Sequence, residues 1–142
     1  MASNEAFARL VWQEEVHFSA ETGNGHVLEL DGNPEPTSQG PSPMELVLTA
    51  LAGCSSMDVI SILRKKRQDV RDLKINAHGV RAEEYPKVFT SITLEYVVTG
   101  KGIDPLAVER AIELARTKYC PVWAMLGKAV EITPTYRIIA VE

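Results

Sequence analysis

The chain has 142 residues, of which 45% are hydrophobic, and its formal net charge is −4. This length is enough for one domain with a real core, because a domain near this size buries roughly 68–70% of its unfolded surface. The negative charge argues against a general affinity for nucleic acid or anionic membranes. The first residues lack a signal-peptide pattern, and no later stretch approaches the roughly 18 apolar residues of a membrane span, so we expect a cytoplasmic protein.

The first part of the chain predicts a small antiparallel β-meander over residues 1–31. Ala6–Trp12 and Val16–Phe18 have strand-like composition. The turn signal Thr22–Gly25 then leads to a third alternating stretch, His26–Leu30. The proline-rich residues 32–43 predict an irregular connection to the next element.

A long helix is expected over residues 42–67. Ser42, Pro43 and Glu45 form a helix start signal, with a capping serine, a first-turn proline and a glutamate at the third helical position. The helix interior is apolar almost all round in its first half, which is typical of a helix buried on most sides. At about 1.5 Å per residue it would reach roughly 35 Å, so we expect its burial to require a second subunit.

The second half predicts a β-hairpin, a helical segment and a last strand. The hairpin is expected over 73–98, and the helical segment over 104–126 opens at Asp104 and Pro105. The last strand, 130–141, contains Pro134, which suits a sheet edge or a bulge because proline has no amide hydrogen to donate.

The two cysteines are the main clue to chemistry. Cys54 lies among small residues within the long helix, and Cys120 directly precedes the helix-breaking Pro121. Their separation of 120 − 54 = 66 positions excludes a CxxC redox motif and a zinc knuckle, although the fold can still bring them together. Free thiols persist in a reducing compartment, where a lone cysteine is more often packed than reactive.

A cysteine pair brought together by the fold could carry out redox chemistry. One thiolate would attack an oxygen or sulfur electrophile, and the second thiol would capture the resulting sulfenic acid as a disulfide. This chemistry needs a cation near the first sulfur. Asp58 lies one helical turn after Cys54 and disfavours the thiolate, so the cation must come from elsewhere in the fold.

Other kinds of site have less support in the sequence. His17, His26 and His78 are isolated, and no glycine-rich phosphate loop occurs, so we expect no metal and no bound cofactor. Two interpretations of Glu45 have equal support in the sequence: it caps the helix, or it is a catalytic carboxylate. On an ideal helix it lies on the opposite side from Cys54 and roughly 13 Å away, so it reaches this sulfur only if the helix bends.

The stretches from Gly40 to Ser55 and from Tyr119 to Val122 resemble the signature of the OsmC/Ohr superfamily of thiol proteins, and residues 56–70 look closest to its YhfA-like branch. The resemblance covers nearly the whole chain. It implies one α+β domain over 1–142, with antiparallel sheets around a long central helix, in an intertwined homodimer with two sites at the subunit boundary. In the peroxidase members, a first cysteine reduces organic hydroperoxides and a second resolves it, with lipoyl or other dithiols as reductant. Cys54 and Cys120 match these two positions.

The sequence departs from the peroxidase pattern at two places. Peroxidase members have a glutamate directly after the proline of the helix start, whereas here Met44 follows Pro43 and the carboxylate is Glu45. They also carry an arginine on an early strand that holds the catalytic thiolate. Residues 16–30 contain no arginine, and Arg9 lies too early to align with it.

The leading hypothesis is therefore a thiol-dependent peroxidase that protects against oxidative stress by reducing organic hydroperoxides. Cys54 would attack, Cys120 would resolve, and Glu45 is the third candidate catalytic residue. The expected partners are a second copy of the chain, a small organic hydroperoxide and an external dithiol such as a lipoylated protein. The alternatives are a non-catalytic module that binds a small apolar ligand, and a thiol redox sensor.

Overall fold

The computed structural model describes residues 4–142, and the chain divides into two compact units, residues 1–47 and 48–142. Residues 1–3 of the expected meander lie outside the described residues, and the single domain over 1–142 stays a prediction. The expected α+β class is confirmed, with two three-stranded sheets and one long helix.

The first unit contains an antiparallel meander. Strands β1 (Ala8–Glu14), β2 (His17–Thr22) and β3 (Val27–Asp31) pair in the order β1-β2-β3. Within residues 4–47, only Ala20 and Asp31 are buried, and Trp12 is 63% exposed. A three-stranded sheet needs an apolar face packed against something to be stable, so this sheet requires cover that the unit itself does not supply.

Helix α1 (Pro43–Lys65) begins where the sequence predicts. The Glu45 carboxylate accepts a hydrogen bond from the Ser42 amide at 3.0 Å, and the Ser42 hydroxyl accepts one from the Glu45 amide at 3.2 Å. This reciprocal capping box confirms the local prediction. The basic residues Arg64 and Lys65 occupy the last turn, where they offset the negative end of the helix dipole.

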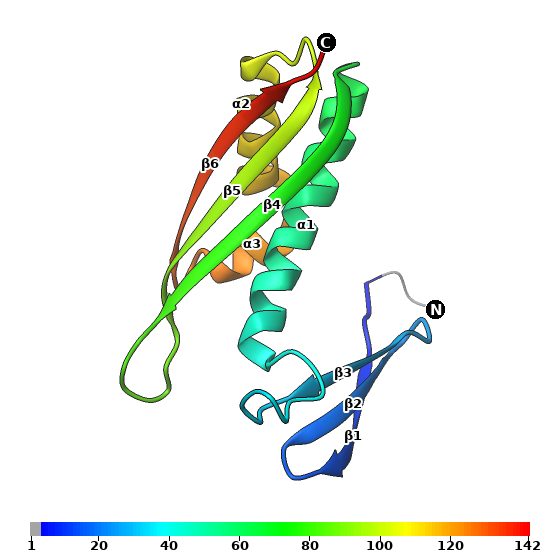
Figure 1. Cartoon of the computed structure of the whole chain (residues 1–142), viewed down its shortest axis with the longest axis vertical. Coiled ribbons are helices and arrows are strands. Elements are labelled where there is room, and N and C mark those ends of the chain that lie inside the picture. The colour runs from blue at the N-terminus through cyan, green and yellow to red at the C-terminus, as the bar shows by residue number, and fades with distance from the viewer. Residues whose placement is uncertain (1–3) are drawn as a thin grey trace. The chain divides into compact units, whose positions relative to one another are not determined.

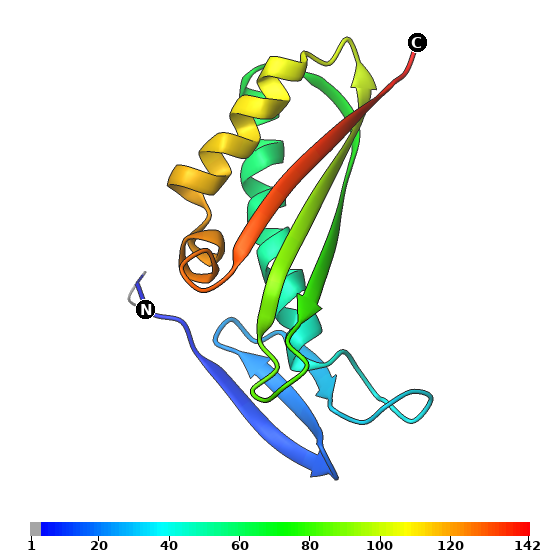
Figure 2. The same cartoon turned by 90° about the vertical axis from the view of Figure 1, so that its left-hand side faces the viewer.

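The second unit packs helices on one face of a sheet (Figures 1 and 2). The sheet has the order β4-β5-β6, with bounds β4 (Asp69–Arg81), β5 (Phe89–Lys101) and β6 (Glu131–Ala140). The helical segment between β5 and β6 consists of α2 (Pro105–Leu114), the π-helical turn η1 (Ala115–Tyr119) and α3 (Pro121–Leu126). Strand β6 lies at the sheet edge, which accommodates Pro134.

One strand pairing differs from the expected antiparallel arrangement. Strands β4 and β5 form the antiparallel hairpin, but β6 runs parallel to β5. The cause is the helical crossover between them, because a connection of this length returns the chain to the same end of the sheet before the next strand begins.

The core of the second unit lies between the sheet and the helices. On α1, buried residues recur at every fourth position: Leu51, Ser55, Val59 and Leu63. On β5, alternate residues are buried: Ile92, Leu94, Tyr96 and Val98. The buried apolar residues of both elements belong to one core, together with those of α2. Within it, the Tyr96 hydroxyl donates a hydrogen bond to the Ser55 hydroxyl at 3.0 Å. Burial raises the pKa of Tyr96 to about 12, so this hydroxyl keeps its proton.

The sequence was expected to contain no segment with the length and composition of a membrane span, and this expectation is wrong. Helix α1 is long and apolar enough to cross a membrane, and 22% of its most apolar 18-residue window is buried. Such a helix is also typical of a protein core. Much of its apolar surface remains uncovered in one chain, including Met57, which is 71% exposed.

The Tyr96 to Ser55 hydrogen bond predicts a measurable contribution to stability. Tyr96→Phe removes the donor, and we expect the free energy of unfolding to fall by about 0.5–1.5 kcal/mol, as for a typical intramolecular hydrogen bond. Urea denaturation measures this change. The matched control is Tyr85→Phe, because Tyr85 is 87% exposed; equal effects of the two substitutions would contradict the assigned role of the bond.

Candidate functional site

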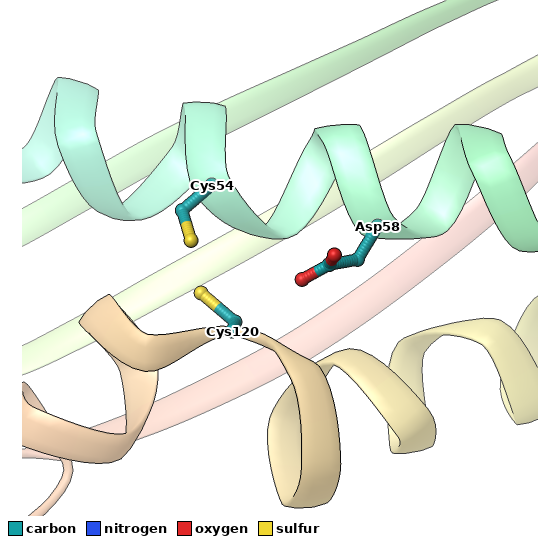
Figure 3. A group of neighbouring side chains, drawn as sticks. All are labelled: Cys54, Asp58 and Cys120. Carbon is teal, nitrogen blue, oxygen red and sulfur yellow. The ribbon is translucent and has the colours of Figure 1, made fainter. Parts of the chain in front are cut away.

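The two sulfur atoms come from elements that hold them in different ways. Cys54 is half-buried in the middle of α1, directly before Ser55, whose hydroxyl is bound by Tyr96. A one-residue step on a helix turns the side chain by about 100°. Ser55 therefore points into the core while Cys54 points to the neighbouring side, toward the segment that carries Cys120 (Figure 3).

Cys120 lies at the junction of two short helical elements. Its amide donates to the Ala115 carbonyl at 2.9 Å, which closes the π-helical turn. Pro121 then starts α3, and the Cys120 sulfur accepts a hydrogen bond from the Trp123 amide at 3.4 Å. π-Helical turns inside helices occur frequently at functional sites. Here the turn ends at Cys120, which is 2% exposed.

Cys54, Cys120 and Asp58 form one cluster, which we call the thiol-carboxylate cluster. The two sulfur atoms and one Asp58 oxygen all lie within 4.8 Å of one another, and the three side chains point toward a common point (Figure 3). The structure thus brings together two sulfurs that are 66 positions apart in sequence. Asp58 was expected only as an unfavourable neighbour of Cys54 and not as a site residue; its spacing of four from Cys54 was the available signal.

The environment of Cys120 disfavours the ionisation of its thiol. Burial and, after it, the hydrogen bond with the Cys54 side chain raise the pKa of Cys120 to about 11, although the Trp123 amide acts in the opposite direction. Cys120 therefore remains a thiol near neutral pH. Since the thiolate is the nucleophile, the half-buried Cys54 is the better candidate for the first attack.

Asp58 has an unusual environment for a carboxylate. Burial raises its pKa above the ordinary value. One of its oxygens, Oδ2, is buried without a hydrogen-bond partner among residues 4–142. The ion pairs found in that part of the chain do not include it.

A cavity of about 430 Å³ opens beside the cluster, and Asp58 is part of its wall. The rest of the wall contains polar, apolar and cationic side chains, namely Ser61, Ile62, Lys65, Lys66, Leu114 and Tyr119. Its size suits a small organic molecule.

Glu45 occupies a different environment from the cysteines. Its carboxylate accepts from the Ser42 amide, and hydrogen bonds with the Ser42 backbone and side chain lower the pKa of Glu45 below its ordinary value. The capping function therefore accounts for its charge and position. A catalytic function of Glu45 stays a prediction.

The elements and the cysteine pair define an α+β protein with a thiol site on its long helix. A family described as OsmC-like protein matches residues 35–135. Protein YhfA of Escherichia coli K12 is 47% identical over 133 residues, which cover 94% of this chain and 98% of YhfA. The chain therefore belongs to the OsmC family, and the resemblance to its YhfA-like branch is confirmed.

Solved structures share the fold over nearly the whole chain. A hypothetical protein from Aquifex aeolicus is 32% identical, with a TM-score of 0.88 and coverage of 98% of this chain and 99% of that one. The organic hydroperoxide resistance protein OhrB of Bacillus subtilis is 16% identical, with a TM-score of 0.65 and coverage of 96% and 100%, and shows the fold alone. Family membership supports a peroxidase-like or redox role.

The deeper burial of Cys120 and its raised pKa predict an order of alkylation. At pH 8, a thiol with a pKa of about 11 is deprotonated in about one molecule in a thousand. We expect iodoacetamide to modify Cys54 first and Cys120 only after unfolding or at strongly alkaline pH. Peptide mapping by mass spectrometry measures both sites in the same native sample, and early modification of Cys120 would contradict the assignment.

Proposed function

We propose that this protein reduces organic hydroperoxides with Cys54 as the attacking thiol and Cys120 as the resolving thiol. The observation that carries the proposal is the approach of the two sulfur atoms within 4.8 Å in one compact unit, with a cavity adjoining the same cluster. The family membership supports this class of chemistry.

The proposed cycle consists of three balanced steps. The Cys54 thiolate attacks the distal peroxide oxygen, the O–O bond breaks, and the alkoxide leaves and takes a proton to become an alcohol. The Cys54 sulfenic acid then reacts with the Cys120 thiol to form a disulfide and release water. An external dithiol, such as a lipoylated protein, reduces this disulfide by thiol exchange and becomes oxidised itself.

The cavity supports an organic peroxide over hydrogen peroxide. Ile62 and Leu114 offer apolar contacts to a hydrocarbon group, and Lys65 and Lys66 suit an acidic group on the same molecule. Fatty or aryl hydroperoxides are therefore the proposed substrates. Since the mechanism needs reduced thiols, the proposed location is the cytoplasm.

The second part of the proposal is a homodimer. One strip of α1 is incompletely covered in a single chain: Ala50 and Met57 are exposed, and Gly53, which lies between them at helical spacing, is half-buried. A Cβ added at Gly53 would meet no atom within 4 Å, so one chain gives no reason for a glycine there. A second α1 approaching closely would give such a reason, and the exposed apolar sheet of the first unit needs cover as well.

The peroxidase proposal predicts dithiol-dependent turnover of cumene hydroperoxide. Cys54→Ser should abolish it, because the attacking sulfur is lost, and Cys120→Ser should stop the cycle at the sulfenic acid. Thr93→Ala on β5 should leave it unchanged. Coupled dithiol consumption measures the rate, with hydrogen peroxide as the slower comparison substrate.

The outcomes separate the candidate functions. A wild-type rate no higher than that of Cys54→Ser would exclude the enzyme, and ligand binding indifferent to this substitution would favour the binding module. A single oxidation without turnover would favour the sensor. Glu45→Gln retains a capping side chain and removes only the charge, so reduced turnover at unchanged stability is expected if Glu45 is catalytic.

The dimer proposal predicts that a bulky residue at Gly53 separates the subunits. Gly53→Leu should shift sedimentation from dimer to monomer, because its side chain occupies the space that the partner helix needs. Thr117→Leu, on the exposed surface of η1, is the matched control. A monomeric wild type, or association only with lipid vesicles, would contradict the dimer.

A further inference from the structure

The thiol-carboxylate cluster has the composition of a metal site, although the sequence contains no metal-binding motif. Its three candidate ligand atoms come from two segments: Cys54 and Asp58 are one turn apart on α1, and Cys120 ends η1. All three lie within 4.8 Å of one another. A tetrahedral zinc ion, with Zn–S near 2.3 Å and Zn–O near 2.1 Å, requires ligand separations of roughly 3.5–3.8 Å, so small side-chain rotations suffice.

A second observation points to a missing ligand at the same place. Asp58 Oδ2 is buried and accepts no hydrogen bond from any residue within 4–142. Buried polar atoms are nearly always satisfied, and one that is not requires an explanation such as an ion. A cation held by this carboxylate and the two sulfurs would give the buried carboxylate a partner.

We propose that the reduced protein binds one thiophilic divalent cation, of which Zn²⁺ is the representative, through Cys54 Sγ, Cys120 Sγ and the Asp58 carboxylate. Two sulfur ligands select zinc-like ions over Mg²⁺ and Ca²⁺, which prefer oxygen. Three protein ligands leave a fourth tetrahedral position for water or another small ligand.

The surroundings support this use of the cluster. The Trp123 amide donates to Cys120 Sγ, and such outer hydrogen bonds orient metal ligands. The Tyr96 to Ser55 bond fixes the residue next to Cys54. Both thiols and the carboxylate belong to residues 48–142, so the proposed ligand set is contained in one compact unit.

Metal binding and disulfide formation are mutually exclusive. Binding replaces two S–H bonds with two metal–thiolate bonds and releases two protons, whereas the disulfide retains no thiolate. A hydroperoxide that oxidises both thiols would therefore release the metal while being reduced to an alcohol and water. The metal site itself does not depend on peroxide turnover.

The test is a titration of the reduced, metal-free wild-type protein with Co²⁺, followed by competition with Zn²⁺. We expect one equivalent per chain and the near-ultraviolet charge-transfer bands of a cobalt–thiolate complex, which Zn²⁺ abolishes. Cys54→Ser and Cys120→Ser should each weaken or remove these bands. Asp58→Asn should lower the affinity at least about tenfold, since even losses outside the ligand set cost about 10–100-fold.

Two controls keep the test decisive. Asp72→Asn, in an exposed ion pair with Lys74 on β4, should bind as the wild type does. If a cysteine variant does not fold, wild type alkylated at Cys54 or oxidised to the disulfide replaces it and should not bind. Absence of thiolate bands in the wild type, or full affinity in Asp58→Asn and in the disulfide form, would overturn the proposal. Neither result depends on whether the protein consumes peroxide.

Discussion

The rotational setting of α1 on its sheet is the constraint on which the site depends. Leu51, Ser55, Val59 and Leu63 face the core, and the Tyr96 hydroxyl binds Ser55 within it. Once this stripe is buried, the directions of all other side chains on the helix follow from its period. Cys54 and Asp58 precede buried residues by one position, so both point to the same flank. The burial of the apolar stripe of α1 thereby sets the direction of the Cys54 thiol and the Asp58 carboxylate.

Cys120 reaches that flank because the second helical segment is interrupted at the right place. The π-helical turn adds one residue to the turn before Cys120, and Pro121 prevents the helix from continuing. The sulfur is then held by the Trp123 amide rather than left free. One thiol is thus carried by a long rigid helix, and the other by a junction whose backbone bonds are irregular. This asymmetry is consistent with the proposed attacking role of Cys54 and the proposed resolving role of Cys120.

The sequence predicted the features that local patterns encode. Ser42, Pro43 and Glu45 located the start of α1, and the hairpin expected over 73–98 lies within the observed strands β4 and β5. It did not predict the parallel pairing of β6, because strand direction depends on the path of the crossover and not on periodicity. The proximity of Asp58 to Cys54 followed from their spacing on the helix, but its proximity to Cys120 was not predicted. A contact across 66 positions, and the unsatisfied oxygen beside it, arise only from tertiary packing.

Both sulfurs belong to the same compact unit of the same chain, and this would set the kinetic order of the proposed disulfide formation. Closure of the bridge is unimolecular, so dilution of the protein leaves its rate unchanged, whereas covalent links between chains would grow with concentration. In the proposed cycle, each copy would therefore complete a two-electron reduction with its own two sulfurs. An assembly that mixed intact and sulfur-deficient copies would therefore lose redox capacity in simple proportion to the defective fraction.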